Sequence, residues 1–331
     1  GVDHAAGEAV RAGQEGCDAR EALDGRMADL SDACWAGLGT ARAADDAGPG
    51  STQPPPASGF TREAYLAAVR RAKEFIAAGD LYQVNLSQRF EASLAAPPYG
   101  LFRRLCRASP APFAAFLNLG DGLAVASASP ERFLLLDGRR AETRPIKGTR
   151  PRGATPEEDG RLRAELEASE KDRAELVMIV DLERNDLGRV CEPGSVEVTE
   201  PRVLETYAQV HHGVATVRGT LRGGAGPVDL LRATFPGGSI TGAPKVRAME
   251  VIDALEPTRR SVYTGAIGCI GFDGRMDLSI AIRTLLVDGA RVTFQAGGGI
   301  VADSDPEAEY EETLVKEKGL MQALGGLGRR A

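Results

Sequence analysis

The chain has 331 residues, and its 40 Lys and Arg against 47 Asp and Glu give a formal net charge of −7. This acidic balance argues against a nucleic-acid-binding protein, whose surface carries a basic face, and no apolar run approaches the roughly 18 residues of a membrane span. Five Cys, odd in number and without a close pair, fit neither a disulfide framework nor a zinc site, so we expect a soluble cytoplasmic protein with no nucleic acid and no membrane as partner.

The composition of the chain changes near residue 60. Residues 1–44 are rich in Ala, Gly and Asp and hold one aromatic residue, Trp35, so we expect a poorly ordered or partly helical N-terminal remnant there. Residues 45–59 read DDAGPGSTQPPPASG, a composition typical of a Pro/Gly/Ser linker. The main domain is then expected to comprise residues 60–331.

Helices and strands are expected from Phe60 onward. Thr61 can cap a first helix that Gly79 can end, and 81–90 then alternates apolar and polar residues as a half-buried strand does. Further strands are expected at 122–128, 132–136, 196–198, 212–221, 262–272, 279–287 and 291–296, and helices at 156–186, 227–233, 244–255 and 306–324. Turn signals such as Asp137-Gly138 join neighbouring strands, which indicates antiparallel hairpins and an α+β fold.

One glycine-rich segment imitates a phosphate-binding loop. Residues 235–245 read FPGGSITGAPK, and Gly237 and Gly242 have the spacing of the first two glycines of that motif. Ala243-Pro244 follow where the motif requires Lys and then Ser or Thr. We therefore expect a turn that leads into a helix beginning at Pro244, and no nucleotide site.

Lysine is rare in this chain, since only six of the 40 basic residues are Lys. Arg does not lose its proton in proteins, so a remaining Lys is of interest wherever chemistry needs an amine. Lys147 lies in the segment RPIKGTRPRG, between Pro145 and Pro151. Its neighbours Arg144 and Arg150, with Arg152, would lower its pKa, which is one route to a nucleophilic amine. A solvated turn is the alternative interpretation.

Two pairs of acidic residues have helical spacing. Asp172 and Glu175 are three positions apart on one expected helix, and Glu309 and Glu312 repeat this spacing on another. Two such pairs facing each other would suit Mg²⁺, which binds carboxylates together with water and an anionic substrate, although solvated helix faces are the alternative. Lys316, four residues after Glu312, fits a helix salt bridge or a contact with a substrate carboxylate.

Two further segments are candidates for a site. Gly297-Gly298-Gly299 follow the expected strand 291–296 and offer backbone amides for an anion, with a plain turn as the alternative. His211 and His212 lie on an expected strand, where one of them should face the interior. A structural His fits that position as well as a catalytic one.

Taken in order along the chain, several long motifs resemble the chorismate-utilising enzymes. They are GDLYQVNLSQRF from Gly79, SPERF from Ser129, the Lys147 segment, DLERNDLG from Asp181, FPGGSITGAPKVRAME from Phe235, AIRT from Ala281, the glycine run and ETLVK from Glu312. The resemblance spans about residues 60–331 and implies two antiparallel β-sheets packed as a sandwich with helices on the outside. PIKGT stands where the anthranilate-forming branch has PIAGT, and so favours the branch that forms 4-amino-4-deoxychorismate for 4-aminobenzoate and folate synthesis.

The resemblance also implies a role for each matching residue. Lys147 corresponds to the nucleophile that adds to ring C2 of chorismate while the C4 hydroxyl leaves, and Glu131 to the general acid that protonates this hydroxyl. The residues that correspond to a Mg²⁺ site are the ligands Glu175 and Glu312, with Asp172 and Glu309 as outer or water-mediated partners. The residues expected to contact the substrate are Arg283, Lys316, Tyr263, Gly297, Gly298, Gly299, Thr149 and His212.

Two other functions stay open at this point. An anthranilate-forming enzyme is the nearer alternative, and a non-catalytic subunit that binds chorismate or docks an amidotransferase is the other. The chain holds no Cys-His-Glu glutaminase constellation, so ammonia would come from solution or from a glutamine amidotransferase subunit or fused domain (component II). Members of this branch usually carry a longer N-terminal region, so residues 1–59 are expected to be a degenerate N-terminus or part of a longer, once fused chain.

Overall fold

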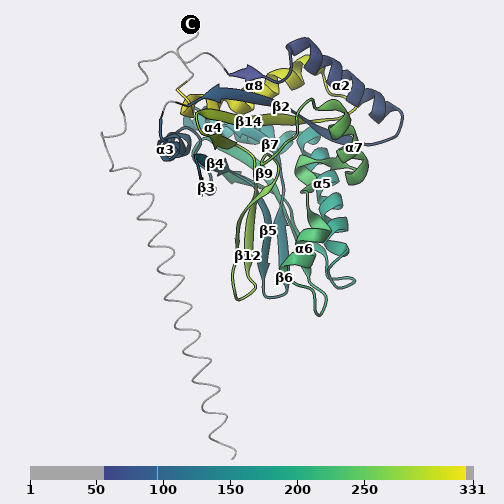
Figure 1. Ribbon diagram of the computed structural model, residues 1–331. Helices are drawn as coiled ribbons and strands as arrows, with labels where there is room; N and C mark the ends of the chain where they lie inside the picture. Colours follow the sequence, from purple (N-terminus) through teal and green to yellow (C-terminus); the bar gives the residue numbers. More distant parts are fainter. Residues whose placement is uncertain (1–55, 95, 326–331) are drawn as a thin grey trace, which may run out of the picture. The chain divides into compact units, whose positions relative to one another are not determined.

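The computed structural model describes residues 56–94 and 96–325, which belong to one compact unit, Thr52–Ala331. In these residues the chain forms two antiparallel β-sheets with helices packed against them, the α+β class expected from the sequence (Figure 1). The expected N-terminal remnant, and the linker as far as residue 55, lie outside the described residues. No helix in the described ranges has the length and apolar content needed to span a membrane.

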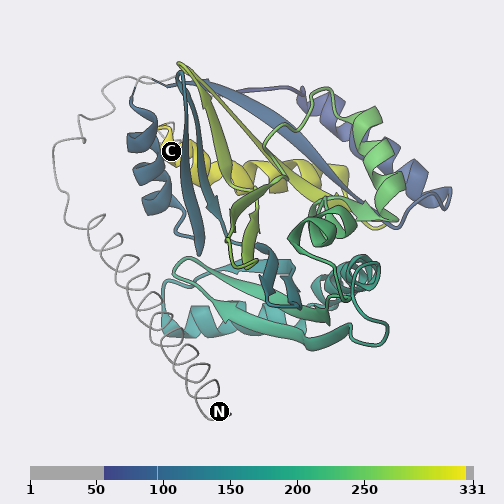
Figure 2. The same cartoon turned by 60° about the horizontal axis from the view of Figure 1, so that its bottom comes forward.

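The first sheet has the strand order β1-β2-β14-β13-β4-β3, and β10 pairs with β2. Its strands are β1 Ala57–Ser58, β2 Gln83–Ser93, β3 Phe113–Gly120, β4 Leu123–Ser129, β10 Gly242–Ala243, β13 Thr284–Asp288 and β14 Arg291–Ile300. Because β1 pairs with β2 through Ala57 and Glu91, the expected linker ends earlier than residue 59. In Figure 2 the yellow helix at the C-terminal end crosses this sheet.

The second sheet has the strand order β11-β12-β5-β6-β9-β7, and β8 also pairs with β9. Its strands are β5 Arg132–Asp137, β6 Arg140–Arg144, β7 Ile146–Pro151, β8 Glu197–Thr206, β9 Val210–Thr220, β11 Ala266–Ile270 and β12 Met276–Ile280. Hairpins at Asp137-Gly138 and Asp273-Gly274 join neighbouring strands, which confirms the antiparallel reading of these turn signals.

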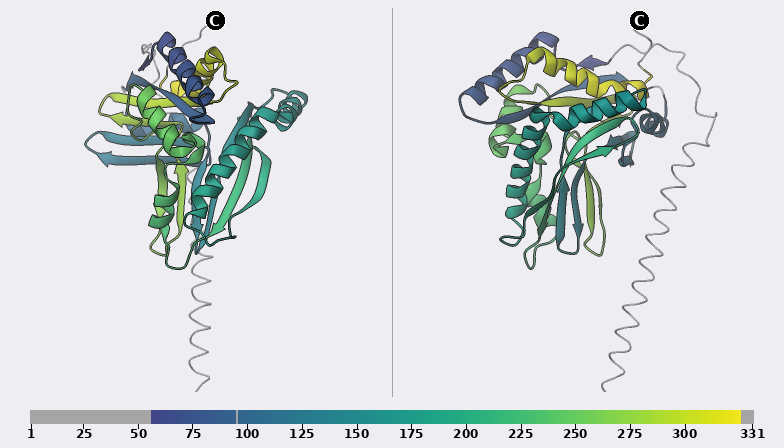
Figure 3. Two further views of the ribbon diagram at one scale, coloured as in Figure 1. Left: turned by 90° about the vertical axis from the view of Figure 1, so that its right-hand side faces the viewer. Right: turned by 180° about the vertical axis from the view of Figure 1, so that it is seen from behind.

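Seven α-helices and one short 3-10 helix accompany the sheets in the described residues. They are α2 Arg62–Ala77, α3 Pro98–Ala108, α4 Pro156–Ala168, α5 Glu170–Gly188, α6 Pro227–Thr234, η1 Gly238–Ile240, α7 Lys245–Leu255 and α8 Pro306–Ala323. Figures 1 and 3 show α5 running along the second sheet, where it contacts β9. The sequence patterns do not indicate α3 or the strands β1, β3, β6, β7 and β10.

Local signals placed several helix ends correctly. Thr61 caps α2 by accepting a hydrogen bond from the amide of Ala64, and Gly79 has the left-handed conformation that favours glycine after a helix. The expected helix 156–186 is wrong as a single element, because Ser169 ends α4 and caps α5 by accepting from the Asp172 amide. Pro244 is the N-cap of α7, as the turn interpretation of that segment predicted.

Three apolar clusters form between the sheets and their helices. One joins the second sheet to α5 and α6 and includes Leu134, Val217 and Leu176. Another joins the first sheet to α3 and α8, and a third joins β2 to α2 and α7. Phe90 and Phe294 stack across β2 and β14 at 5.3 Å between ring centroids. The helices therefore supply the apolar packing of each sheet. The segments that connect the two sheets can carry polar residues.

In the described residues the chain passes between the two sheets four times, and two of these crossovers are neighbours. β4 leads into β5 through Pro130 and Glu131, and β12 leads into β13 through residues 281–283. The expected strand 279–287 is consequently two strands in different sheets. The crossovers are tied together, since the Ile280 amide donates to the Glu131 carbonyl at 3.0 Å and the Ala128 amide donates to the Arg283 carbonyl at 3.1 Å.

Candidate active site

These two crossovers carry a carboxylic acid, Glu131, and a cation, Arg283. Glu131 is only 5% exposed, and burial raises the pKa of its carboxyl, opposed by the Ser239 hydroxyl and the Lys147 ammonium. Arg283 has a positive φ of 49°, a conformation that is uncommon for a side chain other than glycine. Burial lowers the pKa of its guanidinium, and its Nη1 lies 3.4 Å from Ser109 Oγ. Glu131 and Arg283 thus lie on two crossovers that backbone hydrogen bonds hold together.

Lys147 occupies a β-bulge in β7, and not the turn expected from its flanking prolines. Ile146 pairs with Val214 and Thr149 pairs with His212, so Lys147 and Gly148 together oppose the single residue Gly213. A bulge of this kind re-aims side chains. Gly148 has φ +82°, and a Cβ on Gly213 would lie only 2.7 Å from the Lys147 carbonyl oxygen. The bulge therefore depends on glycine on both strands.

The amine of Lys147 points toward the segment before α7. Its Nζ donates to the Ser239 carbonyl at 3.2 Å. Burial lowers its pKa, the Lys316 charge adds to this effect, and Glu175 opposes it. A lowered pKa was expected, but the arginines are not its cause, because each is paired with a carboxylate. The pairs are Arg144 with Glu205, Arg150 with Glu165 and Asp172, and Arg152 with Asp159.

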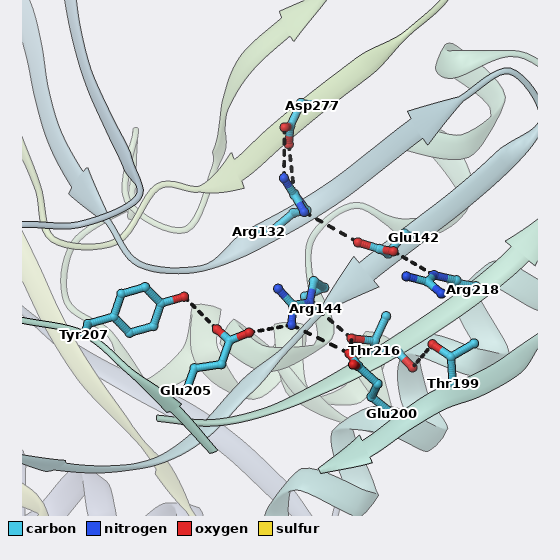
Figure 4. A network of polar contacts seen from close by, with 10 residues as sticks. All are labelled: Arg132, Glu142, Arg144, Thr199, Glu200, Glu205, Tyr207, Thr216, Arg218 and Asp277. Carbon is cyan, nitrogen blue, oxygen red and sulfur yellow. Dashed lines mark hydrogen bonds and ion pairs between the residues drawn. The ribbon is translucent and has the colours of Figure 1, made fainter. Parts of the chain in front are cut away.

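A network of ion pairs supports the strand that leads to Lys147 (Figure 4). Arg144, three residues before it, bonds Glu205 on β8 at 2.6 Å and Thr216 on β9 at 3.1 Å. Farther along the sheet, Arg132 binds Asp277 on β12 through two bonds of 3.1 and 3.2 Å, and contacts the buried Glu142 at 3.5 Å. These contacts tie β5, β6, β8, β9 and β12 together, and β9 in turn pairs with β7, the strand that carries Lys147.

Acidic residues from two helices interact electrostatically with Lys147. Burial raises the pKa of Glu175 on α5, which also feels the charges of Lys147 and of Glu312 on α8. Burial acts in the same direction on Glu312, but Lys316 at 2.6 Å outweighs it and lowers the pKa. The other members of the acidic pairs have partners of their own. Asp172 lies 3.3 Å from Arg150, and Glu309 accepts from Ser304 Oγ at 2.7 Å.

These carboxylates fit a magnesium ion with few protein ligands. Within residues 56–94 and 96–325, no group of three or more His, Cys, Asp or Glu side chains is arranged to hold a metal ion. Mg²⁺ is usually bound by one or two carboxylates plus water and an anionic substrate. Glu175 on α5 and Glu312 on α8 interact electrostatically. These two carboxylates match that donor set. Asp172 and Glu309, expected as outer partners, each have one oxygen with a partner, and so does Glu312.

The glycine run lies inside β14 instead of following it, which corrects the sequence expectation. Gly297 pairs with Ser87 and Gly299 with Asn85 on β2. On the other side, the pairing of β13 with β14 stops at Phe294, so no described strand covers that edge of the run. A Cβ on Gly299 would lie 2.0 Å from Gln83 Nε2, and one on Gly298 would lie 2.9 Å from Glu309 Oε2. Close packing explains why these positions lack side chains.

The remaining predicted contact residues lie around the same junction. Lys316 Nζ donates to the Gly297 carbonyl at 2.9 Å. His212 Nδ1 lies 2.8 Å from Thr149 Oγ1, while its Nε2 is buried without a partner. Burial, followed by the Arg283 charge, lowers the pKa of His212 to about 4, so the ring is neutral at pH 7. Tyr263 is buried in the turn before β11, and burial raises its pKa to about 12.

Several residues of the site were missed from the sequence. Ser239 holds the Lys147 amine through its carbonyl, and any residue type could supply that group, so no side-chain signal exists. Gly213 opposes the bulge, which only the register reveals. His211 is also buried, with Nε2 3.0 Å from Asp159 Oδ1 and Nδ1 2.9 Å from Thr206 Oγ1. Both His residues are therefore interior, where one was expected.

Comparison with known proteins gives one consistent family. The profile of the chorismate binding enzymes matches residues 9–322. Aminodeoxychorismate synthase component 1 of Escherichia coli is 52% identical over 267 residues, which are 81% of this chain and 59% of that protein. Anthranilate synthase component 1 of Thermus thermophilus is 51% identical over 265 residues, 80% of this chain and 57% of that protein. The chain thus spans less than two thirds of either relative.

A solved structure gives the same result for the fold. Anthranilate synthase component I from Streptococcus pneumoniae superposes with a TM-score of 0.74 at 35% identity, covering 91% of this chain and 66% of that one. The two relatives have different names, and their identities to this chain differ by one percentage point. The choice between them therefore depends on particular residues of the site.

Proposed function

Because the chain belongs to the family of chorismate binding enzymes, we propose that it is component I of an aminodeoxychorismate synthase, which converts chorismate and ammonia to 4-amino-4-deoxychorismate. The observation that supports this choice is Lys147. Its amine is half-buried, burial lowers its pKa, and it interacts electrostatically with Glu131, whose pKa burial raises. A neutral amine is a nucleophile, and a protonated carboxyl is a general acid.

The first half of the reaction uses these two groups together. The neutral Lys147 amine forms a C–N bond at ring C2, the ring double bonds shift, and the C4–O bond breaks. Glu131 gives its proton to the departing hydroxyl, which leaves as water, and becomes a carboxylate. Burial of Glu131 supports this role because it raises the pKa of the carboxyl and so favours the protonated form.

The second half restores the enzyme. Ammonia forms a C–N bond at C4, the double bonds shift back, and the bond from C2 to Lys147 breaks with its electron pair returning to the amine. The Glu131 carboxylate takes one proton from the new ammonium group. Chorismate and ammonia have then become 4-amino-4-deoxychorismate and water, and both side chains have regained their starting protonation states.

Other residues of the site would hold the substrate in place. Arg283 and Lys316 are cations suited to the two carboxylates of chorismate, and the open edge of β14 offers backbone amides beside them. Glu175 and Glu312 would hold Mg²⁺, with Asp172 and Glu309 as outer partners. Bound there, the ion would neutralise the charge of a ring carboxylate and orient the ring. Thr149 and His212 would line the ring on the β7 side.

An anthranilate synthase is the second candidate, and the Thermus thermophilus relative favours it. Such an enzyme adds ammonia at C2, the atom that Lys147 would occupy. We further propose that the ammonia comes from a glutamine amidotransferase subunit or a fused amidotransferase domain, and that the protein works in the cytoplasm. The amidotransferase proposal rests on the name of the Escherichia coli relative, which is that of one component of a synthase.

The experiment that tests the function is a product assay with chorismate, MgCl₂ and ammonium at pH 8.5. Separation by chromatography with mass detection distinguishes 4-amino-4-deoxychorismate, which keeps its enolpyruvyl group, from anthranilate, which is fluorescent and is released with pyruvate. Formation of the C4-aminated product supports the proposal. Anthranilate as the main product would refute it, and no turnover at all would favour a non-catalytic chorismate-binding subunit.

A further inference from the structure

A lysine outside the reacting groups holds the segment against which the Lys147 amine rests. Lys245, the first residue of α7, has a side chain that is only 12% exposed. Its ammonium donates to Asp186 Oδ2 at 2.5 Å, to the Thr234 carbonyl at 2.7 Å and to the Pro236 carbonyl at 2.6 Å. A lysine ammonium has three donors and no acceptor, so every donor is used.

These three acceptors come from three parts of the chain. Asp186 is on α5 and is 4% exposed as a side chain, Thr234 ends α6, and Pro236 begins the turn that carries Ser239. Lys245 therefore joins two helices to the start of this turn. Lys suits this position because its ammonium is a compact charge with three donors, whereas the guanidinium of Arg is a planar fork.

The other end of the same turn is held by a second buried cation. Arg260 donates to the Ile240 carbonyl at 2.8 Å and to the Asn85 carbonyl at 2.7 Å, and its charge is balanced by Glu256 at 2.7 Å. The Asn85 amide in turn donates to the Thr241 carbonyl at 2.8 Å. Ser239 thus lies between two fixed ends, and its carbonyl has little freedom to move away from Lys147.

We propose that Lys245 is a positioning residue for the reaction: it fixes the Ser239 carbonyl, and this carbonyl holds the Lys147 amine at ring C2. Two readouts test this inference; the first rests on the proposed function and the second does not. When the amine is no longer held, C2 is left unoccupied for part of the time, and ammonia can attack that carbon directly. Loss of Lys245 should therefore change which atom is aminated, and not only the rate.

The first readout is the ratio of C2-aminated to C4-aminated product, which does not depend on how much of a preparation is active. We expect Lys245→Met to raise this ratio at least about tenfold, since small displacements of a reacting group have large effects on its step. Removing one partner of a buried ion pair destabilises a fold strongly. Asp186→Asn, which keeps a hydrogen-bond acceptor, is therefore the second variant and should raise the ratio by a smaller factor.

Lys73→Met is the matched control. Lys73 is also a half-buried lysine that donates to a backbone carbonyl, that of Ser304, but it lies on α2. The Lys73→Met variant should leave the product ratio unchanged. An unchanged ratio in both Lys245→Met and Asp186→Asn would overturn the proposal, and so would an equal rise in Lys73→Met.

The second readout needs no activity, so it separates this inference from the proposed function. Hydrogen–deuterium exchange followed by mass spectrometry should show at least about tenfold faster exchange of amides in 235–242 and 146–149 for Lys245→Met, and not for Lys73→Met. If the wild-type protein aminates nothing, the proposed function fails, but the exchange result still decides whether Lys245 holds the segment that carries Ser239. Unchanged exchange in both segments would refute the positioning role of Lys245 even where the wild type makes the C4-aminated product.

Discussion

Glu183 gives the sharpest test of the electrostatics around the site. It lies on α5, is 6% exposed, and accepts a hydrogen bond from Thr143 Oγ1 at 2.8 Å. It also lines a small cavity of about 10 Å³ with Phe133, Leu187 and other residues. Burial raises the pKa of its carboxyl from 4.5 to about 8. At pH 7 the folded protein therefore holds this carboxyl neutral, whereas the unfolded chain ionises it.

The size of the effect follows from the difference between the two pKa values. Because the folded state binds one more proton than the unfolded state between pH 4.5 and pH 8, stability falls by about 1.4 kcal/mol per pH unit across that window. Below pH 4.5 both states are protonated and the loss disappears. Glu183→Gln cannot ionise, and its amide oxygen can still accept from Thr143. The variant should gain about 2.5 kcal/mol in unfolding free energy over the wild type on going from pH 5 to pH 7.

Urea denaturation followed by far-UV circular dichroism at pH 5, 6 and 7 measures this difference. The control is Glu170→Gln, at an exposed glutamate on the same helix. Its difference from the wild type in unfolding free energy should be the same at all three pH values, because water solvates both side chains. A Glu183→Gln difference that stays constant within about 0.5 kcal/mol from pH 5 to pH 7 would refute the reasoning. It would mean that the folded protein accommodates an ionised carboxylate behind the turn that carries Ser239.

Three further predictions concern the site. Lys147→Ala should abolish C4 amination and redirect any remaining product to C2, as measured by chromatography of the product mixture; continued efficient C4 amination would rule out the covalent route. Glu131→Gln should lower kcat by roughly 10²- to 10⁴-fold because a proton donor is lost, and a rate within threefold of the wild type would contradict its role. Gly213→Ala should lower unfolding free energy by about 1–3 kcal/mol in thermal denaturation, since its Cβ would meet the Lys147 carbonyl at 2.7 Å. Gly223→Ala, where a Cβ would meet nothing within 4 Å, should change stability little.

Features that depend on neighbouring residues in the chain could be predicted from the sequence. Thr61 and Gly79 mark the ends of α2 because a cap acts within one turn of helix. Ser169 carried the same kind of signal, with Asp172 three positions later, and it was overlooked within a longer helical pattern. Lys147 stood out because it is one of few lysines and because its segment matches a known motif.

Features that depend on distant partners could not be predicted. The bulge at Lys147 exists only through the register of β7 against β9, and Gly213 is explained only by the carbonyl opposite it. The break between β12 and β13 is invisible in the apolar pattern of 279–287, because both halves are strands. The origin of the lowered pKa of Lys147 was also misjudged, since the sequence shows three nearby arginines but not the carboxylates that pair with them.

The two crossovers have a mechanical consequence. Within the described residues, the two neighbouring crossovers carry Glu131 and Arg283, and backbone hydrogen bonds join these crossovers. Two further crossovers, from β9 to β10 and from β10 to β11, join the same two sheets. Glu131, the proposed proton donor, is therefore carried by one of four covalent links between the sheets, and a change in how the sheets pack would reach it directly.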